Sequence, residues 1–151
     1  MSIVEESIEV QVPVRTAYNQ WTQFEEFPRF MEGVEQVQQL SDDTLRWVAE
    51  IGGKKREWTA KITEQEPDHR VAWTSAEGAR NAGVVTFHPL SDGQSRVMLQ
   101  LEYEPEGAVE KTGDAVGLVK SRVKGDLERF KEYIESRGQE TGAWRGKIQN
   151  N

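Results

Sequence analysis

The chain has 151 residues, a formal net charge of −7 and no cysteine. This length fits one domain large enough to bury a hydrophobic core. The acidic balance argues against a nucleic acid or an anionic membrane as partner, because both require a basic patch. The lack of cysteine excludes disulfides and Cys-based metal sites.

The first seven residues carry two glutamates and no apolar run, which argues against a signal peptide. No stretch of the chain approaches the ~20 apolar residues of a membrane span. We therefore expect a cytoplasmic protein without integral membrane association.

Residues 4–12 alternate between apolar and polar side chains, which predicts a half-buried strand with Ile8, Val10 and Val12 on one side. Pro13 suits the first turn of a short helix, and apolar residues at helical spacing carry it to about Gln23. Aromatic residues crowd around Pro28 and indicate a second short helix or turn: Phe24, Phe27, Phe30 and Met31.

From Gly33 to Tyr103 the apolar pattern has a period of two, interrupted by short turns such as Gly52-Gly53. Together with the first strand this predicts seven strands in one antiparallel meander with a single apolar face. That face is expected to hold Leu45, Trp47, Ala49, Ile51, Arg56, Trp58, Ala60, Ile62, Val71, Trp73, Ser75, Val85, Phe87, Val97, Leu99, Leu101 and Tyr103.

Residues 107–138 predict one long amphipathic helix, with Gly138 as its C-cap. Its apolar residues lie three, four or seven positions apart: Val109, Val116, Val119, Val123, Leu127, Phe130 and Ile134. A sheet with one apolar face needs a cover, and only this helix is long enough. The expected fold is α+β, a seven-stranded antiparallel sheet curled around a long C-terminal helix.

Three glycines interrupt this helix: Gly113, Gly117 and Gly125. Each costs about 1 kcal/mol relative to alanine. The first two thin the N-terminal half, whereas bulky residues fill the other half. Either a neighbouring strand approaches closely there, or the thin half roofs a cavity.

We place a single domain at residues 1–138 and expect 139–151, which are polar and glycine-rich, to be a mobile tail. Trp144 is the one possible anchor of this tail, and we expect it to be solvent-exposed.

The usual catalytic signatures are missing: the chain has no phosphate loop, no nucleophile elbow and no histidine pair at metal spacing. A surface role is expected for His69, and a rim or structural role for His88. We assign no catalytic residue, which leaves open whether the protein is an enzyme, and we expect no cofactor and no metal.

The aromatic residues of the apolar face suit either a filled core or a pocket, since small-molecule pockets are mostly apolar with a few polar groups. Arg56, Ser75 and Tyr103 are the best polar candidates, with Arg56 expected at a mouth. The predicted lining is Trp47, Arg56, Trp58, Trp73, Ser75, Phe87, Leu99, Tyr103, Gly113, Val116, Gly117, Val119 and Val123.

Four segments carry a family resemblance: IEVQVPVRTAYNQWTQFEEFPRFM, KKREWTAKITEQEPDHRVAWTS, NAGVVTFHPLSDGQSRVMLQLEYEPEG and VKGDLERFKEYIESRG. They resemble the polyketide cyclase/dehydrase group of bacterial START-like (SRPBCC, Bet v 1-like) proteins over about residues 3–138. The resemblance implies a helix-grip fold with a deep hydrophobic cavity between sheet and helix. It extends more weakly to coenzyme-Q-binding proteins, which bind lipid quinones.

The leading functional hypothesis is binding of a small hydrophobic ligand such as a lipid, quinone or polyketide. The alternatives are a polyketide cyclase or dehydratase and a ligand-free interaction or stress module. For the enzyme, the residues to replace first are Arg56, Ser75, Tyr103 and His88. The sequence leaves the oligomeric state open between monomer and dimer.

Overall fold

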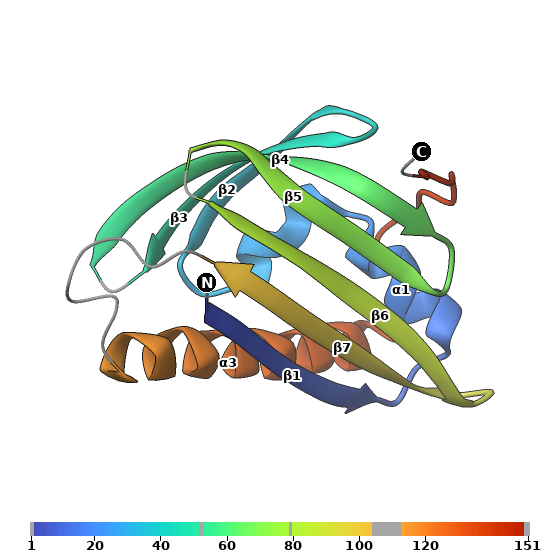
Figure 1. The fold of residues 1–151 in the computed structure, drawn as a ribbon. Coiled ribbons are helices and arrows are strands. Elements are labelled where there is room, and N and C mark those ends of the chain that lie inside the picture. Colours follow the sequence, from blue (N-terminus) through green and yellow to red (C-terminus); the bar gives the residue numbers. More distant parts are fainter. Residues whose placement is uncertain (1, 52, 79, 104–112, 150–151) are drawn as a thin grey trace.

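The computed structural model describes residues 2–51, 53–78, 80–103 and 113–149. An antiparallel sheet curls around one face of a long helix, which confirms the predicted helix-grip arrangement (Figure 1). The elements in chain order are β1 (Ser2–Val10), α1 (Val14–Trp21), the 3-10 helix η1 (Phe24–Arg29), β2 (Val34–Ser41), β3 (Thr44–Ile51), β4 (Lys54–Glu66), β5 (Arg70–Gly78), β6 (Asn81–Ser91), β7 (Gln94–Tyr103) and α3 (Gly113–Arg137).

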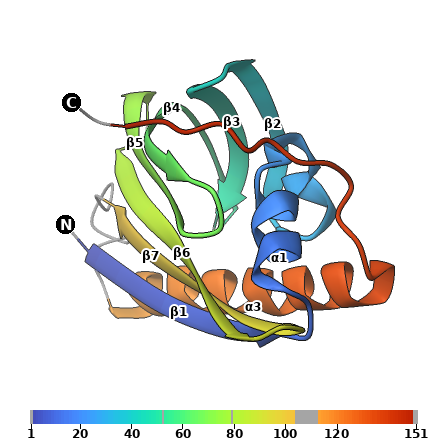
Figure 2. The same ribbon diagram turned by 90° about the vertical axis from the view of Figure 1, so that its right-hand side faces the viewer.

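The sheet has seven strands in the order β1-β7-β6-β5-β4-β3-β2, and every neighbouring pair is antiparallel. Strands β2 to β7 form the predicted meander. The N-terminal strand does not continue this meander, because β1 pairs with β7 and forms the opposite edge from β2. The two short helices connect these edges across the concave side of the sheet (Figure 2).

Every second side chain along a strand points to the same face of the sheet, and the alternating apolar residues therefore lie on the concave face, where the core forms. The helix α3 covers this face next to β1 (Figure 1). Two hydrogen bonds fix its C-terminal half there: the Lys131 ammonium donates to the Glu9 carbonyl at 2.9 Å, and the Gln11 amide donates to the Glu135 carboxylate at 2.7 Å.

The apolar stripe of α3 packs as its spacing predicts, with Val123, Leu127, Phe130 and Ile134 all buried. Gly138 ends the helix with φ of +74°, and its amide donates to the Ile134 carbonyl at 2.9 Å. The predicted C-cap is therefore confirmed. The predicted helical residues 107–112, Val109 included, lie outside the described residues.

Residues 139–149, expected from sequence as a mobile tail, lie against the body of the domain in the structure (Figure 2). They leave α3, pass α1 and reach β4, where Ile148 forms a β-bridge with Gln65. Trp144 is half-buried in this arrangement, whereas we expected it to be exposed. Within the described ranges, no helix has the length and apolar character needed to cross a bilayer.

Candidate functional site

One end of the interior, beside α1 and η1, is filled by aromatic rings. Trp21 contacts Phe27 and Phe130 with ring centroids 5.2 Å apart in each case, and Phe30 lies 5.3 Å from Phe130. These rings are at most 4% exposed. Such edge-on and tilted packing excludes water, so this end of the interior contributes to the stability of the fold.

The other end of the concave face, towards the N-terminal half of α3, carries aromatic side chains that are only half-buried. Trp47 and Trp58 are directly opposite each other in the β3–β4 hairpin. Their rings stack with centroids 5.6 Å apart and planes within 9° of parallel. The pair forms a flat apolar surface, which is the strongest feature of the candidate site.

Trp73 covers the middle of this face because its partner in β6 has no side chain. It pairs in register with Gly83, and its indole N–H donates to the Asn81 side-chain oxygen at 3.0 Å. The Asn81 amide in turn donates to the Ser75 hydroxyl at 3.1 Å. Trp73 and Ser75, both predicted site residues, are thus connected through Asn81.

Gly83→Ala is expected to destabilise the fold by about 1–3 kcal/mol, because it overpacks a filled position. The new Cβ would lie 2.5 Å from the Trp73 ring and 2.8 Å from the Gln100 carbonyl oxygen, so the backbone must shift. Urea unfolding measures the loss. Gly93→Ala is the matched control, since nothing lies within 4 Å of its Cβ position. Equal stability of the two variants would contradict the placement of the Trp73 ring.

Two polar atoms at this end are buried and find no hydrogen-bond partner in the described part of the chain: the Trp47 indole nitrogen and the Tyr103 hydroxyl. Tyr103 is opposite Asn81 in the β6–β7 pair and shares the concave face. A buried group without a partner costs about 1–3 kcal/mol. These two groups would therefore gain from a ligand that offers them polar atoms.

The remaining predicted site residues divide between the two ends. Phe87 belongs to the filled end, where it packs 5.3 Å from Tyr18. Leu99 and Val123 are buried, and Val119 is half-buried. Arg56 is half-buried opposite Ala49, near the start of β4. The last three, Gly113, Val116 and Gly117, lie in the first turns of α3, but the surroundings of these positions are outside the described residues.

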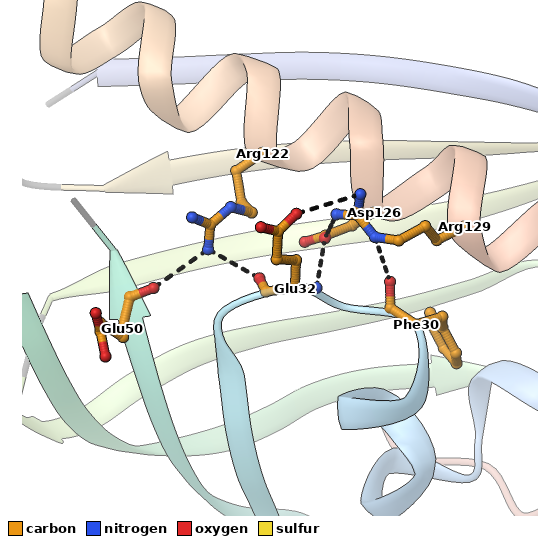
Figure 3. A network of polar contacts seen from close by, with 6 residues as sticks. All are labelled: Phe30, Glu32, Glu50, Arg122, Asp126 and Arg129. Carbon is orange, nitrogen blue, oxygen red and sulfur yellow. Dashed lines mark hydrogen bonds and ion pairs between the residues drawn. The ribbon is translucent and has the colours of Figure 1, made fainter. Parts of the chain in front are cut away.

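A polar network joins α3 to the segment between η1 and β2 (Figure 3). The Arg122 guanidinium donates to the carbonyls of Glu32 at 2.8 Å and Glu50 at 3.2 Å. The Arg129 guanidinium donates to the Phe30 carbonyl at 2.9 Å and pairs with the Asp126 carboxylate. This network was not predicted from the sequence, where its only local signal is the Asp126–Arg129 pair about one helical turn apart.

Burial makes Asp126 unusual among the carboxylates. Its side chain is 14% exposed and accepts the Glu32 amide at 3.0 Å. Desolvation raises the pKa of Asp126 to about 6, although Arg129 and the Glu32 amide both act to lower it. The network therefore holds a desolvated carboxylate, with its pKa raised to about 6, at the junction of α3 with the curled sheet.

Side chains that could hold a metal ion are not grouped in the described ranges, which contain no set of three His, Asp or Glu residues placed to share one. Both histidines are exposed. His88 lies on the convex face and contacts the Thr86 hydroxyl at 2.9 Å.

A curled antiparallel sheet that holds a long helix against an aromatic face defines the helix-grip class. The profile of the polyketide cyclase / dehydrase and lipid transport family matches residues 10–132, and the chain belongs to this family. The resemblance found in the sequence is thereby confirmed.

A protein from Streptomyces lincolnensis, described as an uncharacterized 17.2 kDa protein in the melC2-rnhH intergenic region, is 60% identical over 149 residues, 98% of this chain and 99% of the relative. TTHA0849 from Thermus thermophilus superposes with a TM-score of 0.80 at 23% identity, over 91% of this chain and 100% of its own. Zhui aromatase/cyclase from Streptomyces sp. R1128 superposes with a TM-score of 0.77 at 16% identity, over 95% of this chain and 99% of its own. Likeness to solved structures at these identities shows the shared fold.

Proposed function

We propose that the protein binds a small hydrophobic molecule, such as a lipid, quinone or polyketide, between the concave face of the sheet and the N-terminal half of α3. The observation that carries this proposal is the parallel Trp47–Trp58 pair, which stays only half-buried although Trp47 borders the filled end, with its ring centroid 5.5 Å from that of Phe27. A flat aromatic surface of this kind suits a planar or chain-like apolar ligand.

The polar groups at this end support the same function. Small-molecule sites combine an apolar lining with a few polar atoms that fix the orientation of the ligand. Ser75 and Tyr103 face inwards, and Trp47 offers an indole N–H without a partner in the described ranges. A ligand oxygen that accepts from Trp47 or Tyr103 would remove the cost of leaving these groups unsatisfied.

Native mass spectrometry of the purified protein, followed by organic extraction, tests the proposal directly. We expect a discrete extra mass that denaturation releases, and extraction then identifies the chemical class of the ligand. A protein that purifies without a ligand and binds none of a panel of quinones, fatty acids and aromatic polyketides would contradict the proposal.

Trp58→Ala is expected to weaken binding of a short-chain ubiquinone probe at least tenfold. Loss of the ring removes both apolar area and a stacking contribution of about 0.5–1.5 kcal/mol. Quenching of tryptophan fluorescence measures the dissociation constant. The matched control is Trp144→Ala, which removes a half-buried tryptophan that lies beside Thr22 and η1 and should leave the affinity unchanged. Equal losses in the two variants would place the probe elsewhere.

A polyketide cyclase or dehydratase is the second candidate, favoured by the family to which the chain belongs and by the aromatase/cyclase among its structural neighbours. Such chemistry needs ionisable or hydroxyl groups that converge on the ligand. Arg56, Ser75 and Tyr103 are the groups to replace first. His88 faces the convex side, about 23 Å along β6 from Asn81 at ~3.3 Å per residue. Turnover of a poly-β-keto thioester that survives all three replacements would exclude them as the catalytic set.

A further inference from the structure

The C-terminal segment 140–148 contacts the domain mainly through polar groups that it meets on two elements distant in the sequence. Figure 2 shows it passing over α1 and ending beside β4 and β5. Of the residues in this segment, Ile148 alone packs partly against the hydrophobic core of the described ranges. The way in which the domain holds this segment is therefore a question of hydrogen bonds and charge.

Three side chains, at the C-terminal end of α1 and at its C-cap residue, form hydrogen bonds with the segment. The Gln20 amide group forms two hydrogen bonds with one residue, donating to the Thr141 hydroxyl at 3.1 Å and accepting from the Thr141 main-chain amide at 2.9 Å. The Thr22 hydroxyl accepts the Trp144 amide at 3.0 Å, and Asn19 donates to the Glu140 carboxylate at 3.0 Å.

The second element is the free edge of β4. Strand β3 pairs with β4 only as far as Lys61, so the last residues of β4 extend beyond their neighbour. Gln65 uses this free edge to exchange two main-chain hydrogen bonds with Ile148, at 2.8 and 2.9 Å. This is β-strand addition, a common way for a domain to bind an extended peptide.

A charged anchor lies between these two elements. The Arg145 guanidinium donates to the Asn19 side-chain oxygen at 2.6 Å and to the Asp68 carboxylate at 2.8 Å. It also lies over the Tyr18 ring, 5.7 Å from the centroid. An arginine held by a carboxylate, an amide and an aromatic face is typical of specific peptide recognition.

We propose that Asn19, Gln20, Thr22, Gln65 and Asp68 form a peptide-recognition groove, the tail groove, and that the chain's own segment 140–148 is its ligand. The segment is held as a peptide, because side-chain amides, a hydroxyl, the Asp68 carboxylate, the Tyr18 ring and one strand edge supply its described contacts, and Ile148 alone packs partly against the core. The groove fits an extended segment that presents an arginine to Asp68 and a main-chain pair to Gln65. This proposal is independent of the hydrophobic site.

The test uses the full-length chain with Arg145→Glu and Ile148→Pro. Arg145→Glu places a second carboxylate beside Asp68. Ile148→Pro removes the main-chain N–H that donates to the Gln65 carbonyl. We expect the Thr141 and Trp144 amides to lose protection from hydrogen exchange while unfolding stays cooperative. A synthetic peptide of residues 139–149 should then bind and shift the NMR signals of Gln20 and Gln65.

The control peptides carry one charge reversal each. A peptide with Arg145→Glu should bind at least tenfold more weakly, whereas one with Lys147→Glu, at an exposed position, should bind like the natural sequence. Failure of the natural peptide to bind the released variant, or equal affinity of the two control peptides, would overturn the proposal.

Asp68→Asn keeps the test decisive if the double variant does not fold. Asp68 has φ of +65°, a conformation that asparagine tolerates well, so the turn should persist while the charge is lost. We expect the Trp144 amide to exchange at least tenfold faster than in the natural chain. Unchanged exchange would also overturn the proposal.

Discussion

Phe130→Ala is expected to lower the free energy of unfolding by about 3–5 kcal/mol, among the largest effects of any single side-chain truncation in this protein. Phe130 is fully buried and contacts the rings of both Trp21 and Phe30. Truncation leaves a cavity between α3 and the two short helices that rigid neighbours can only partly close. Urea unfolding followed by far-UV circular dichroism measures the change.

Leu40→Ala serves as the control, because Leu40 is 53% exposed on the edge strand β2. This replacement should change the free energy of unfolding by no more than about 0.5 kcal/mol. A loss below about 1 kcal/mol for Phe130→Ala would mean that the filled end is not closely packed.

The contrast with Trp58 separates stability from binding. Truncation at the filled end should lower stability without removing a contact to the ligand, so Phe130→Ala measured below its unfolding midpoint should retain affinity for the quinone probe. Trp58→Ala should show the reverse, a smaller loss of stability and weaker binding of the probe. This difference is expected because truncation of a half-buried ring costs less stability than truncation of a fully buried ring.

The sequence predicted most of the fold because its elements are long and strongly periodic. The Trp47–Trp58 pair shows how far this reasoning reaches: both residues lie on the same face and equally far from the Gly52-Gly53 turn, so a tight hairpin must place them opposite each other. The end of α3 at Gly138 could also be predicted from the local sequence, because Gly138 lies about one helical turn after Ile134, the last apolar residue of the stripe.

What the sequence did not predict depends on contacts between distant residues. The pairing of β1 with β7 leaves no local signal, because each strand alone shows only its own alternation. Asn19, Gln20 and Thr22 have the pattern of an ordinary polar helix face in the sequence, whereas in the structure they are buried and bonded to residues of the C-terminal segment. The ligand stays unidentified for a related reason, since an apolar site selects by shape and shape depends on packing.

The polar network on α3 was also missed, and it gives the second large effect. The position of Asp126 is clear from the geometry: it accepts hydrogen bonds from the Glu32 amide and the Arg129 guanidinium where α3 meets the segment before β2 (Figure 3). Burial raises its pKa from 3.8 to about 6 despite these partners. Between these two values the folded state binds more protons than the unfolded state, so stability falls as pH rises.

The free energy of unfolding of the natural chain should therefore fall by about 3 kcal/mol between about pH 3.5 and pH 7 because of Asp126. This follows from the shift of its pKa, at about 1.4 kcal/mol per pKa unit. Asp126→Asn removes the titration and keeps the shape, so the difference in stability between variant and natural chain should change with pH across this window. Urea unfolding at intervals across the same window measures it. Asp92→Asn, which makes the same change in net charge at an exposed turn, controls for overall charge.

A constant difference between Asp126→Asn and the natural chain at every pH would show that Asp126 is not desolvated in the folded state. The sign of the pH dependence matters as much as its size. An ion pair that stabilised the fold would be lost as pH falls, whereas a desolvated carboxylate is relieved by protonation. If the natural chain becomes more stable relative to Asp126→Asn as the pH falls, Arg129 and the Glu32 amide do not fully offset the cost of burying the Asp126 carboxylate. The contact between α3 and the segment before β2 is then most stable when this carboxyl group is neutral.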